Sequence, residues 1–348
     1  MSSENSSGRP VRDVGIVGFG SYVPERRLGV EFFGDTSADQ SAAPALMRPP
    51  RFRHHVAPDE RAADMIERAA HTMFDRLALS PEGNVDILLT NVLLPDALFT
   101  GSGAEVAHRL GCSPKVILDL HNTGCASFPY LLKLAKLLID SGEGDTALIA
   151  NVQNSAGQIF AQDQVRGRGH AATPGDGCGV AYLTAGGPSP ILGVFTKNSP
   201  EYARDVRPVR QDGRKYWEPG DSEVDVEFDR ELGADIIARG NRLVPEVVSG
   251  VCETAGIARD DIDILVTNQP NRIFLKNWSA DLGLKSHQHL DTFDLFGNLY
   301  GAAAPITMDH AIRDGSIDHG DLVVIAGFAH AGDFAAAGLV HWHGASQH

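Results

Sequence analysis

The sequence predicts an α/β fold built from two copies of one unit, and two repeated segments support this prediction. Residues 85–91 read VDILLTN, and residues 262–268 read IDILVTN. Residues 144–151 read GDTALIAN, and residues 320–327 read GDLVVIAG. The two pairs are offset by 177 and 176 positions, so they share nearly one spacing. A shared offset in two independent segments indicates a duplication of about half the chain.

Each copy contains short apolar runs that predict strands. The runs are Ile87–Leu89, Ala147–Ala150, Ile264–Val266 and Leu322–Ala326. Asp, Gly and Asn bound these runs, and continuous apolar character is typical of strands that are buried on both faces.

Four stretches with apolar residues at three- and four-residue intervals predict helices. They are Asp59–Leu77, Pro129–Ser141, Asp229–Gly256 with a candidate break at Gly240, and Ala302–Asp314. The second and the fourth stop at a glycine, which is a common helix end. Strands that alternate with helices predict covered, largely parallel sheets. We expect residues 35–58 to be a loop insertion, and residues 186–222 to hold the connection between the copies and surface loops.

The composition excludes several classes of protein. The apolar fraction of 43% argues against disorder, and a formal charge of −15 makes nucleic acid a poor partner. Four cysteines without a CxxC pair favour a reduced, cytoplasmic protein. We find neither a signal-peptide pattern nor an apolar run of about 18 residues, so we expect no membrane association. No ligand set clusters in the sequence, and no metal is proposed.

Cys125 is the candidate nucleophile. The offset of 176 places Cys125 opposite Gly301, three residues beyond Asn298. We therefore expect Cys125 and Asn298 to face each other at the N-termini of two pseudo-symmetric helices. A helix N-terminus lowers the pKa of a thiol, and a thiolate can accept an acyl group from a thioester. The alternative is that Cys125 is an inert buried cysteine, since free cysteines are often buried.

Four segments, in order, resemble the 3-oxoacyl-[acyl-carrier-protein] synthase III family, which has the thiolase-like fold. They are the opening strand and loop Gly15–Pro24, the nucleophile segment Asn122–Phe128, the segment Gly175–Ala181 that is similar to a GDGAGA turn, and Gly297-Asn298 ahead of the small residues from Gly301. The resemblance runs from Val11 to Trp342. It implies a flexible tail (residues 1–10), halves at 11–187 and 188–348, and five αβαβα layers.

The resemblance also implies an activity, which is ping-pong acyl transfer. Cys125 would take an acyl group from coenzyme A or an acyl carrier protein and pass it to a second substrate. Backbone amides near Cys125 and in the loop that ends at Gly332 would hold the oxyanion. Asn298 matches the asparagine that assists decarboxylation of a malonyl extender in the family. The resemblance implies no permanently bound cofactor beyond the donor's phosphopantetheine, and it implies a homodimer.

One motif departs from the family. The family has His-Gln-Ala-Asn where this chain has Asn268-Gln-Pro-Asn271. An asparagine donates a hydrogen bond but does not exchange a proton near neutral pH, and losing a general base costs about 10²–10⁴ in rate. His330, in a glycine-rich loop, is the candidate substitute, and its alternative is a surface histidine. His121, His287 and His289 are weaker candidates.

A basic cluster marks a candidate substrate mouth. It contains Arg48 and Arg51, with Arg53, His54 and His55 beside them. It overlaps the family's arginine stretch, and it would steer a phosphopantetheine or an acidic carrier protein to the site. The alternative is that these arginines balance local acids. The aromatic residues Phe99, Phe128, Phe160 and Phe296 are candidate pocket walls or core residues.

Three functions stay open at this point. The first is an acyltransferase of specialised metabolism that passes the acyl group to a hydroxyl, amine or thiol acceptor. The second is a decarboxylative carbon–carbon condensing synthase that uses a malonyl-type extender. The third is a degenerate subunit that supports an active partner, and the retention of Cys125 and Asn298 argues against it.

Overall fold

The computed structural model describes residues 12–34, 48–121, 123–215, 217–228, 233–330 and 333–344. Its main feature is one ten-stranded sheet in the order β12-β11-β13-β14-β8-β1-β7-β6-β4-β5. The strands are β1 (Val14–Tyr22), β4 (Ile87–Val92), β5 (Val116–Leu120), β6 (Thr146–Gln153), β7 (Gly177–Ala185), β8 (Ser189–Lys197), β11 (Ile264–Thr267), β12 (His289–Leu290), β13 (Leu322–Ala329) and β14 (Phe334–His341).

The strand order repeats on either side of the middle of the sheet. From each outer edge inward, the order is the third, second, fourth, fifth and first strand of that half. The two first strands, β1 and β8, meet through Gly15 opposite Pro190 and Ile16 opposite Ser189. The predicted duplication of an α/β unit is therefore confirmed. The predicted boundary at residues 187 and 188 falls between β7 and β8 and stays a prediction.

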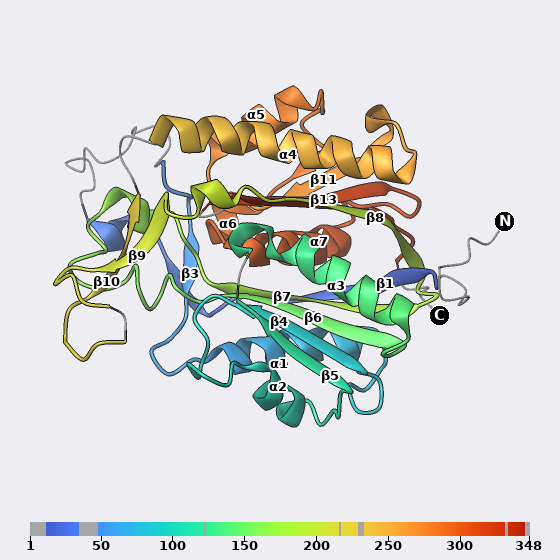
Figure 1. Ribbon diagram of the computed structural model, residues 1–348, viewed down its shortest axis with the longest axis horizontal. Helices are drawn as coiled ribbons and strands as arrows, with labels where there is room; N and C mark the ends of the chain where they lie inside the picture. The colour runs from blue at the N-terminus through green and yellow to red at the C-terminus, as the bar shows by residue number, and fades with distance from the viewer. Residues whose placement is uncertain are drawn as a thin grey trace.

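Helices and strands stack in five layers, as predicted (Figure 1). Helices α3 (Ser127–Ser141) and α7 (Ala303–Asp314) lie in the middle, between the two halves of the sheet. Helices α1 (Ala62–Arg76) and α2 (Gly103–Arg109) cover one outer face. Helices α4 (Gly233–Ala255) and α5 (Arg272–Asp281) cover the other.

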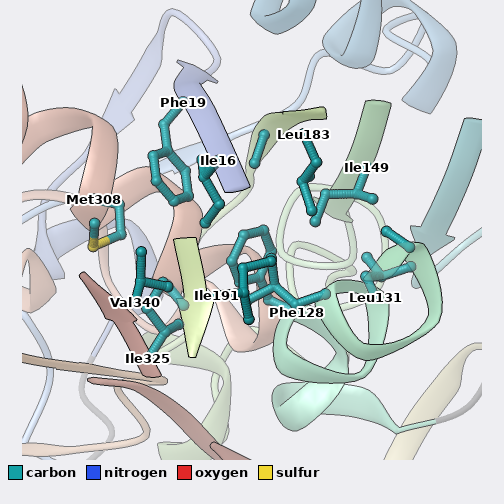
Figure 2. Close-up of a cluster of buried hydrophobic side chains, with 14 of the residues drawn as sticks. Ile16, Phe19, Phe128, Leu131, Ile149, Leu183, Ile191, Met308, Ile325 and Val340 are labelled. Atoms are coloured by element: carbon teal, nitrogen blue, oxygen red, sulfur yellow. The ribbon is translucent and has the colours of Figure 1, made fainter. Parts of the chain in front are cut away.

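The largest hydrophobic cluster fills the middle layer (Figure 2). Phe128 and Leu131 of α3 and Met308 of α7 pack there between strands of both halves. The rings of Phe19 and Phe128 lie 6.0 Å apart. Because the apolar side chains of α3 meet strands of both halves, its sequence has a dense leucine pattern, interrupted by Lys133, Lys136 and Asp140.

Short elements extend the sheet region on one side (Figure 1). Two small sheets pair β2 (Arg26–Leu28) with β3 (Arg53–His55), and β9 (Val206–Arg210) with β10 (Val224–Phe228). The remaining short helices are η1 (Val30–Phe33), η2 (Gly124–Ala126), η3 (Gly169–Ala172), η4 (Pro200–Tyr202), η5 (Arg259–Asp261), α6 (Phe293–Phe296) and η6 (Tyr300–Ala302).

Three expectations need correction. The sheet is mixed: β4, β5 and β6 are parallel to one another, as are β11, β12 and β13, but β7, β1, β8 and β14 run antiparallel to their neighbours. Residues 186–222 include β8 and β9 besides loops. Helix α4 runs unbroken through Gly240, where an added Cβ would lie 2.7 Å from the rings of Phe274 and Phe328. The glycine therefore serves close packing and does not break the helix.

Helix ends agree with the expected ranges to within a few residues. Helix α1 begins at Ala62 instead of Asp59, because the carboxylate of Asp96 accepts the free N–H groups of Ala62 and Ala63. Residues 1–11 and 35–47, which include the predicted tail, lie outside the described residues. Within the described ranges, no helix combines the length and apolar character needed to cross a bilayer.

Candidate active site

The candidate nucleophile sits on a sharp turn between β5 and α3. Thr123 has φ of 73° and Gly124 has φ of 42°, and Cys125 follows in the short helix η2. A positive φ is rare for a β-branched residue such as threonine, and such strain tends to gather at functional sites. The turn presents Cys125 at the N-terminus of α3, as the sequence predicted.

A chain of buried side-chain amides holds this turn. The Ser127 hydroxyl donates to the Gly124 carbonyl at 2.6 Å and accepts from Asn151 Nδ2 at 2.7 Å. Asn151 Nδ2 also donates to Asn91 Oδ1 at 3.2 Å, and Asn91 Nδ2 donates to the Leu120 carbonyl at 2.8 Å. Each link is a buried or partly buried hydrogen bond, so breaking one leaves a costly unpaired group.

Two glycines of the C-terminal half fit tightly around the turn. A Cβ on Gly301 would lie 2.0 Å from Ser127 Oγ and 2.8 Å from the Gly124 carbonyl oxygen. A Cβ on Gly327 would lie 2.7 Å from the Cys125 carbonyl oxygen. Both distances are too short for any side chain, so the two halves close on the nucleophile through backbone contact.

The pKa of the Cys125 thiol is shifted in the opposite direction to the one predicted from the sequence. Burial raises its pKa to about 12, whereas the sequence predicted a pKa lowered by the helix dipole. The cause is the loss of hydration around the thiol. Cys125 nevertheless keeps some exposed surface, so it is not fully enclosed.

Asn298 is held by the segment that resembles the GDGAGA turn. Its N–H donates to the Thr173 carbonyl at 3.0 Å, and its carbonyl accepts from Gly175 N–H at 3.1 Å. A Cβ on Gly175 would lie 1.9 Å from the Phe296 carbonyl oxygen, so this motif needs a glycine. Next in that motif, Asp176 is buried and accepts three backbone N–H groups. The segment that begins at Gly175 therefore helps to fix the backbone position of Asn298.

The side chain of Asn298 is oriented by a local bond. Its Oδ1 accepts the N–H of Tyr300 at 3.1 Å. Because an N–H group can only donate, this bond fixes which end of the amide is oxygen. The Nδ2 group then points away, and within the described part of the chain it has no protein partner. The structure brings η6 against η2, and so it brings the segments of Asn298 and Cys125 together.

Asn268 occupies a different setting from the one the family histidine implies. It is 1% exposed, its Nδ2 donates to the Phe328 carbonyl at 3.2 Å, and its Oδ1 accepts the Phe328 N–H at 3.0 Å. Both ends of the amide are thus bonded to the backbone of β13. This pairing extends the contact between β11 and β13 by one residue, which is a structural task.

His330 follows β13 directly. Burial and nearby Arg239 lower its pKa to about 4, so the imidazole is neutral at pH 7. Its Nδ1 is buried and has no hydrogen-bond partner among the residues that the structure describes. The preceding residue, Ala329, would contact a Cβ on Gly124 at 3.1 Å, which places the end of β13 beside the nucleophile turn.

The weaker histidine candidates lie in other settings. His289 is buried between the hydroxyls of Thr267 and Ser279, and burial lowers its pKa to about 4. His121 and His287 are exposed. A role for any of the three in proton transfer stays a prediction without further support.

The basic cluster is only partly what the sequence predicted. Arg48 and Arg51 are exposed and lie near Asp294, which also pairs with Arg272. Arg53 is buried and donates to two backbone carbonyls, and His55 is buried with a pKa lowered to about 3. The cause is the alternation of β3, which turns every second side chain inward. The exposed part of the cluster is therefore smaller than expected.

The aromatic candidates differ in how far they are exposed to solvent. Phe128 and Phe160 are core residues, whereas Phe99 is 95% exposed. Phe99 lies beside a surface pocket of about 280 Å³, whose lining also includes Leu120 and His121 shortly before the nucleophile turn. Its role in substrate binding stays a prediction. Gly332 and Asn122 lie outside the described residues.

Tyr300 was not among the residues predicted from the sequence. Its place two residues after the candidate catalytic Asn298 could have marked it as a residue near the site. Tyr300 has φ of 48°. Its hydroxyl interacts electrostatically with the Cys125 thiol, and burial raises the pKa of the phenol well above its usual value.

Comparisons with known proteins agree with this arrangement. A model described as 3-oxoacyl-[acyl-carrier-protein (ACP)] synthase III matches residues 118–200, and the C-terminal model of the same family matches residues 252–342. Together the two matches cover half of the chain. The chain belongs to the 3-oxoacyl-[acyl-carrier-protein] synthase III family. It is therefore related to acyl-transferring condensing enzymes, and its fold is thiolase-like.

Individual relatives are similar along nearly their whole length. The β-ketoacyl-[acyl-carrier-protein] synthase III of Clostridium perfringens is 24% identical over 91% of this chain and 96% of its own, and that of Rhizobium meliloti is 27% identical over 89% and 94%. The crystal structure of FabH from Thermus thermophilus has a TM-score of 0.80 at 24% identity, covering 95% of this chain and 99% of its own. OleA from Xanthomonas campestris has a TM-score of 0.78 at 18% identity, covering 95% and 97%.

A metal has no evident place in this synthase III relative. Among the described residues, no group of three or more His, Cys, Asp or Glu side chains is arranged to hold a metal ion.

Proposed function

We propose that this protein is an acyltransferase that works through an acyl-Cys125 intermediate. The observation that supports it best is the nucleophile turn, on which Cys125 is presented at a helix end and enclosed by Gly301 and Gly327 of the other half. The positive φ of Thr123 supports the proposal, because strained backbone conformations gather at active sites.

The proposed reaction has two steps. In the first, the Cys125 sulfur attacks the carbonyl carbon of an acyl thioester, the carbon–sulfur bond to the donor breaks, and the thiol proton passes to the departing donor sulfur. In the second, a hydroxyl, amine or thiol acceptor attacks acyl-Cys125, and its proton returns to the Cys125 sulfur. Backbone N–H groups at η2 and in the loop after β13 would hold the oxyanion in both steps.

The raised pKa of Cys125 makes proton removal part of the first step. We propose that His330 relays this proton from the Cys125 sulfur to the departing donor sulfur, since its imidazole is neutral at pH 7 and its buried Nδ1 has no hydrogen-bond partner among the described residues. Asn268 is not proposed as a proton carrier, because its amide is bonded at both ends to Phe328. The departure from the family motif at Asn268 supports a place in specialised metabolism.

A second candidate function is decarboxylative condensation of acyl-Cys125 with a malonyl-type extender. The observation in its favour is the Nδ2 of Asn298, which has no partner among the described residues, in a segment that the packing of η6 on η2 brings to the nucleophile turn. Without an imidazole at residue 268, the enolate oxygen would depend on such neutral donors.

We propose that an acyl carrier protein or coenzyme A delivers the acyl group by its phosphopantetheine arm. The curated relatives are named for the carrier protein. Arg48 and Arg51 are exposed beside α6, which leads directly into Gly297 and Asn298, so they stand where an acidic carrier would be steered. A cytoplasmic location is part of this proposal.

We also propose a homodimer that forms through β5. This strand is the last in the sheet, and its residues Ile117 and Leu118 are 36% and 42% exposed. Leu98 and Phe99 stand exposed nearby, beside the pocket that Leu120 also lines. A long exposed apolar edge is an aggregation hazard unless another strand covers it, and a second copy of β5 would do so.

The test is the intact-protein mass after incubation with a panel of acyl-coenzyme A and acyl-carrier thioesters. We expect an adduct of the acyl mass on the parent protein and none on Cys125→Ala. Cys112→Ala is the matched control, because Cys112 is also a free cysteine but is buried away from the turn. No adduct with any donor would overturn the proposal and turn attention to the degenerate-subunit alternative. Carbon dioxide released by added malonyl thioester would favour condensation.

A further inference from the structure

Arg239 is a buried arginine that belongs to none of the motifs discussed so far. It lies on α4, and its side chain is 8% exposed. Its Nε donates to Asp333 and one of its terminal nitrogens donates to Asp205, and both carboxylates are buried. The guanidinium also lies 3.7 Å from the centroid of the Tyr202 ring. One side chain therefore joins α4, the segment ahead of β9 and the end of the β13–β14 hairpin.

Asp333 lies at this hairpin end, whose described residues are Ala329, His330, Asp333 and Phe334. Asp333 is 0% exposed, and its φ of 39° is in the left-handed region that a residue with a side chain rarely adopts. Its Oδ2 accepts from Arg239, whereas its Oδ1 is buried and has no hydrogen-bond partner among the described residues. Removing the partner of a buried charge is strongly destabilising, so the conformation of the hairpin end depends on Arg239.

The hairpin end packs against the segment that carries the nucleophile. Both β13 and β14 contact η2, in which Cys125 lies. The Phe334 ring lies 6.3 Å from the ring of Tyr130, on α3, and meets it edge to face. Ala329 would contact a Cβ on Gly124 at 3.1 Å. A displacement of the hairpin end would therefore disturb the contacts that enclose the nucleophile turn.

The same stretch of α4 also contacts the other strand of the hairpin. Gly240 follows Arg239, and a Cβ on Gly240 would lie 2.7 Å from the Phe328 ring, so the helix and β13 are in close contact there. The Phe328 ring meets the imidazole of His330 edge to face, with the two centroids 4.7 Å apart. Two neighbouring residues of α4 thus hold β13 through packing and the start of β14 through an ion pair. The position of His330 depends on both.

We propose that Arg239 is a positioning residue for acyl transfer, whose ion pair with Asp333 holds the hairpin end, and His330 with it, against the nucleophile turn. This inference rests on the proposed function, because it assigns the anchor of the loop after β13 that would hold the oxyanion. Arg239 acts through Asp333 and has no role of its own in the reacting bonds. The ion pair is formed before the substrate arrives, so it requires no reorganisation during the reaction.

The test compares two variants that each remove one carboxylate from the same guanidinium, Asp333→Ala and Asp205→Ala. Both should lower the urea midpoint, since both break a buried ion pair. Only Asp333→Ala should slow acylation of Cys125 by a short pantetheine thioester, by about 10- to 100-fold, because a misplacement of about 1 Å costs up to about 10² in rate. The loss should lie in the rate constant at saturating thioester, with the half-saturating concentration nearly unchanged. If Asp333→Ala does not fold, Asp333→Asn, which keeps the size and removes the charge, should show a smaller loss in the same direction.

Hydrogen exchange of the unacylated protein tests the positioning without turnover. The peptide that spans the nucleophile turn and the start of α3 should exchange about 10-fold faster in Asp333→Ala and at the parent rate in Asp205→Ala. Parent-like exchange and acylation by Asp333→Ala would overturn the inference, as would equal losses in the two variants, since the ion pairs would then be structural only. If no donor acylates the parent protein, the proposed function fails, and the exchange comparison still decides whether Asp333 holds the nucleophile turn.

Discussion

The repeated motif ends in an asparagine in both halves, but the two asparagines have different hydrogen-bond partners. Asn91 ends the repeated motif in the first half and lies opposite Asn151 of β6. Asn268 ends the motif in the second half, where the register of β11 on β13 places Gly327 in the corresponding position. Asn91 and Asn151 bond to each other and through Ser127 to the nucleophile turn. Among the described residues, the side-chain amide of Asn268 bonds only to the backbone of Phe328.

This difference shows how a duplicated fold becomes an asymmetric site. Where the first half has the amide of Asn151, the second has no side chain, and the Cys125 carbonyl occupies the space. Conversely, Gly301 corresponds to Cys125 and lies against Ser127 and Asn151. The first half contributes the thiol and the polar side chains behind it. The second half contributes Gly301 and Gly327, whose lack of a side chain leaves room for them.

The largest expected effect concerns the thiol itself and its dependence on pH. Because the pKa of Cys125 is raised to about 12, the thiolate fraction should rise about tenfold per pH unit between pH 7 and 10. Alkylation of Cys125 by iodoacetamide, followed by peptide mass, should therefore accelerate about 10³-fold over that range. A rate that levels off below pH 9 would mean that the helix dipole prevails over burial.

The next largest effect is expected from adding a side chain at Gly301. Gly301→Ala places a Cβ 2.0 Å from Ser127 Oγ, and overpacking of this kind costs about 1–3 kcal/mol. We expect a lower urea midpoint and a slower acylation of Cys125. Gly167→Ala is the control, since nothing lies within 4 Å of its added Cβ. Parent-like acylation by Gly301→Ala would show that the two halves are less closely fitted than described.

The two asparagines that end the repeated motif sharpen the comparison directly. Asn91→Ala and Asn268→Ala each break bonds at buried sites, and each should cost about 1–3 kcal/mol in urea unfolding. Only Asn91→Ala should also slow acylation several-fold, because only Asn91 is linked to the turn through Asn151. If both variants slow acylation equally, the two asparagines are functionally equivalent and the asymmetry argued above is wrong.

The smallest effect is expected at the exposed arginines. Arg48→Ala with Arg51→Ala should weaken carrier-protein association a few-fold at low salt, because exposed charges mainly steer the encounter. The difference should shrink at 0.5 M sodium chloride. Acylation by a short pantetheine thioester serves as the control and should not change. A salt-independent loss would assign these arginines to the folded structure instead.

The sequence predicted the parts of the molecule that depend on periodicity and repetition. Strands such as β4 and β13 and the duplicated order follow from apolar runs and one offset, and the turn at Cys125 follows from its motif. The direction of the Cys125 pKa shift did not, because burial depends on how β13 and η6 close over the turn. Tyr300 was missed for a related reason, since only the folded chain packs η6, which begins at Tyr300, against η2.

The split between Arg53 and Arg51 teaches a similar lesson. Both are arginines in one basic stretch, yet Arg53 is buried and Arg51 is exposed. The difference follows from where β3 begins, since Arg53 is its first residue and Arg51 precedes it, and a sequence does not show the start of so short a strand. Charge patterns in loops therefore predict a surface only where the local backbone is already known.

The close contact between Gly327 and the Cys125 carbonyl has a consequence for the synthesis of the chain. Cys125 belongs to the first half, but the residues that close around it come from near the C-terminal end. A ribosome that has made the first half has produced a cysteine without its enclosure. The nucleophile therefore matures late, only after β13 has emerged and docked. Until then it is an ordinary thiol, exposed to oxidants and not yet able to select an acyl group.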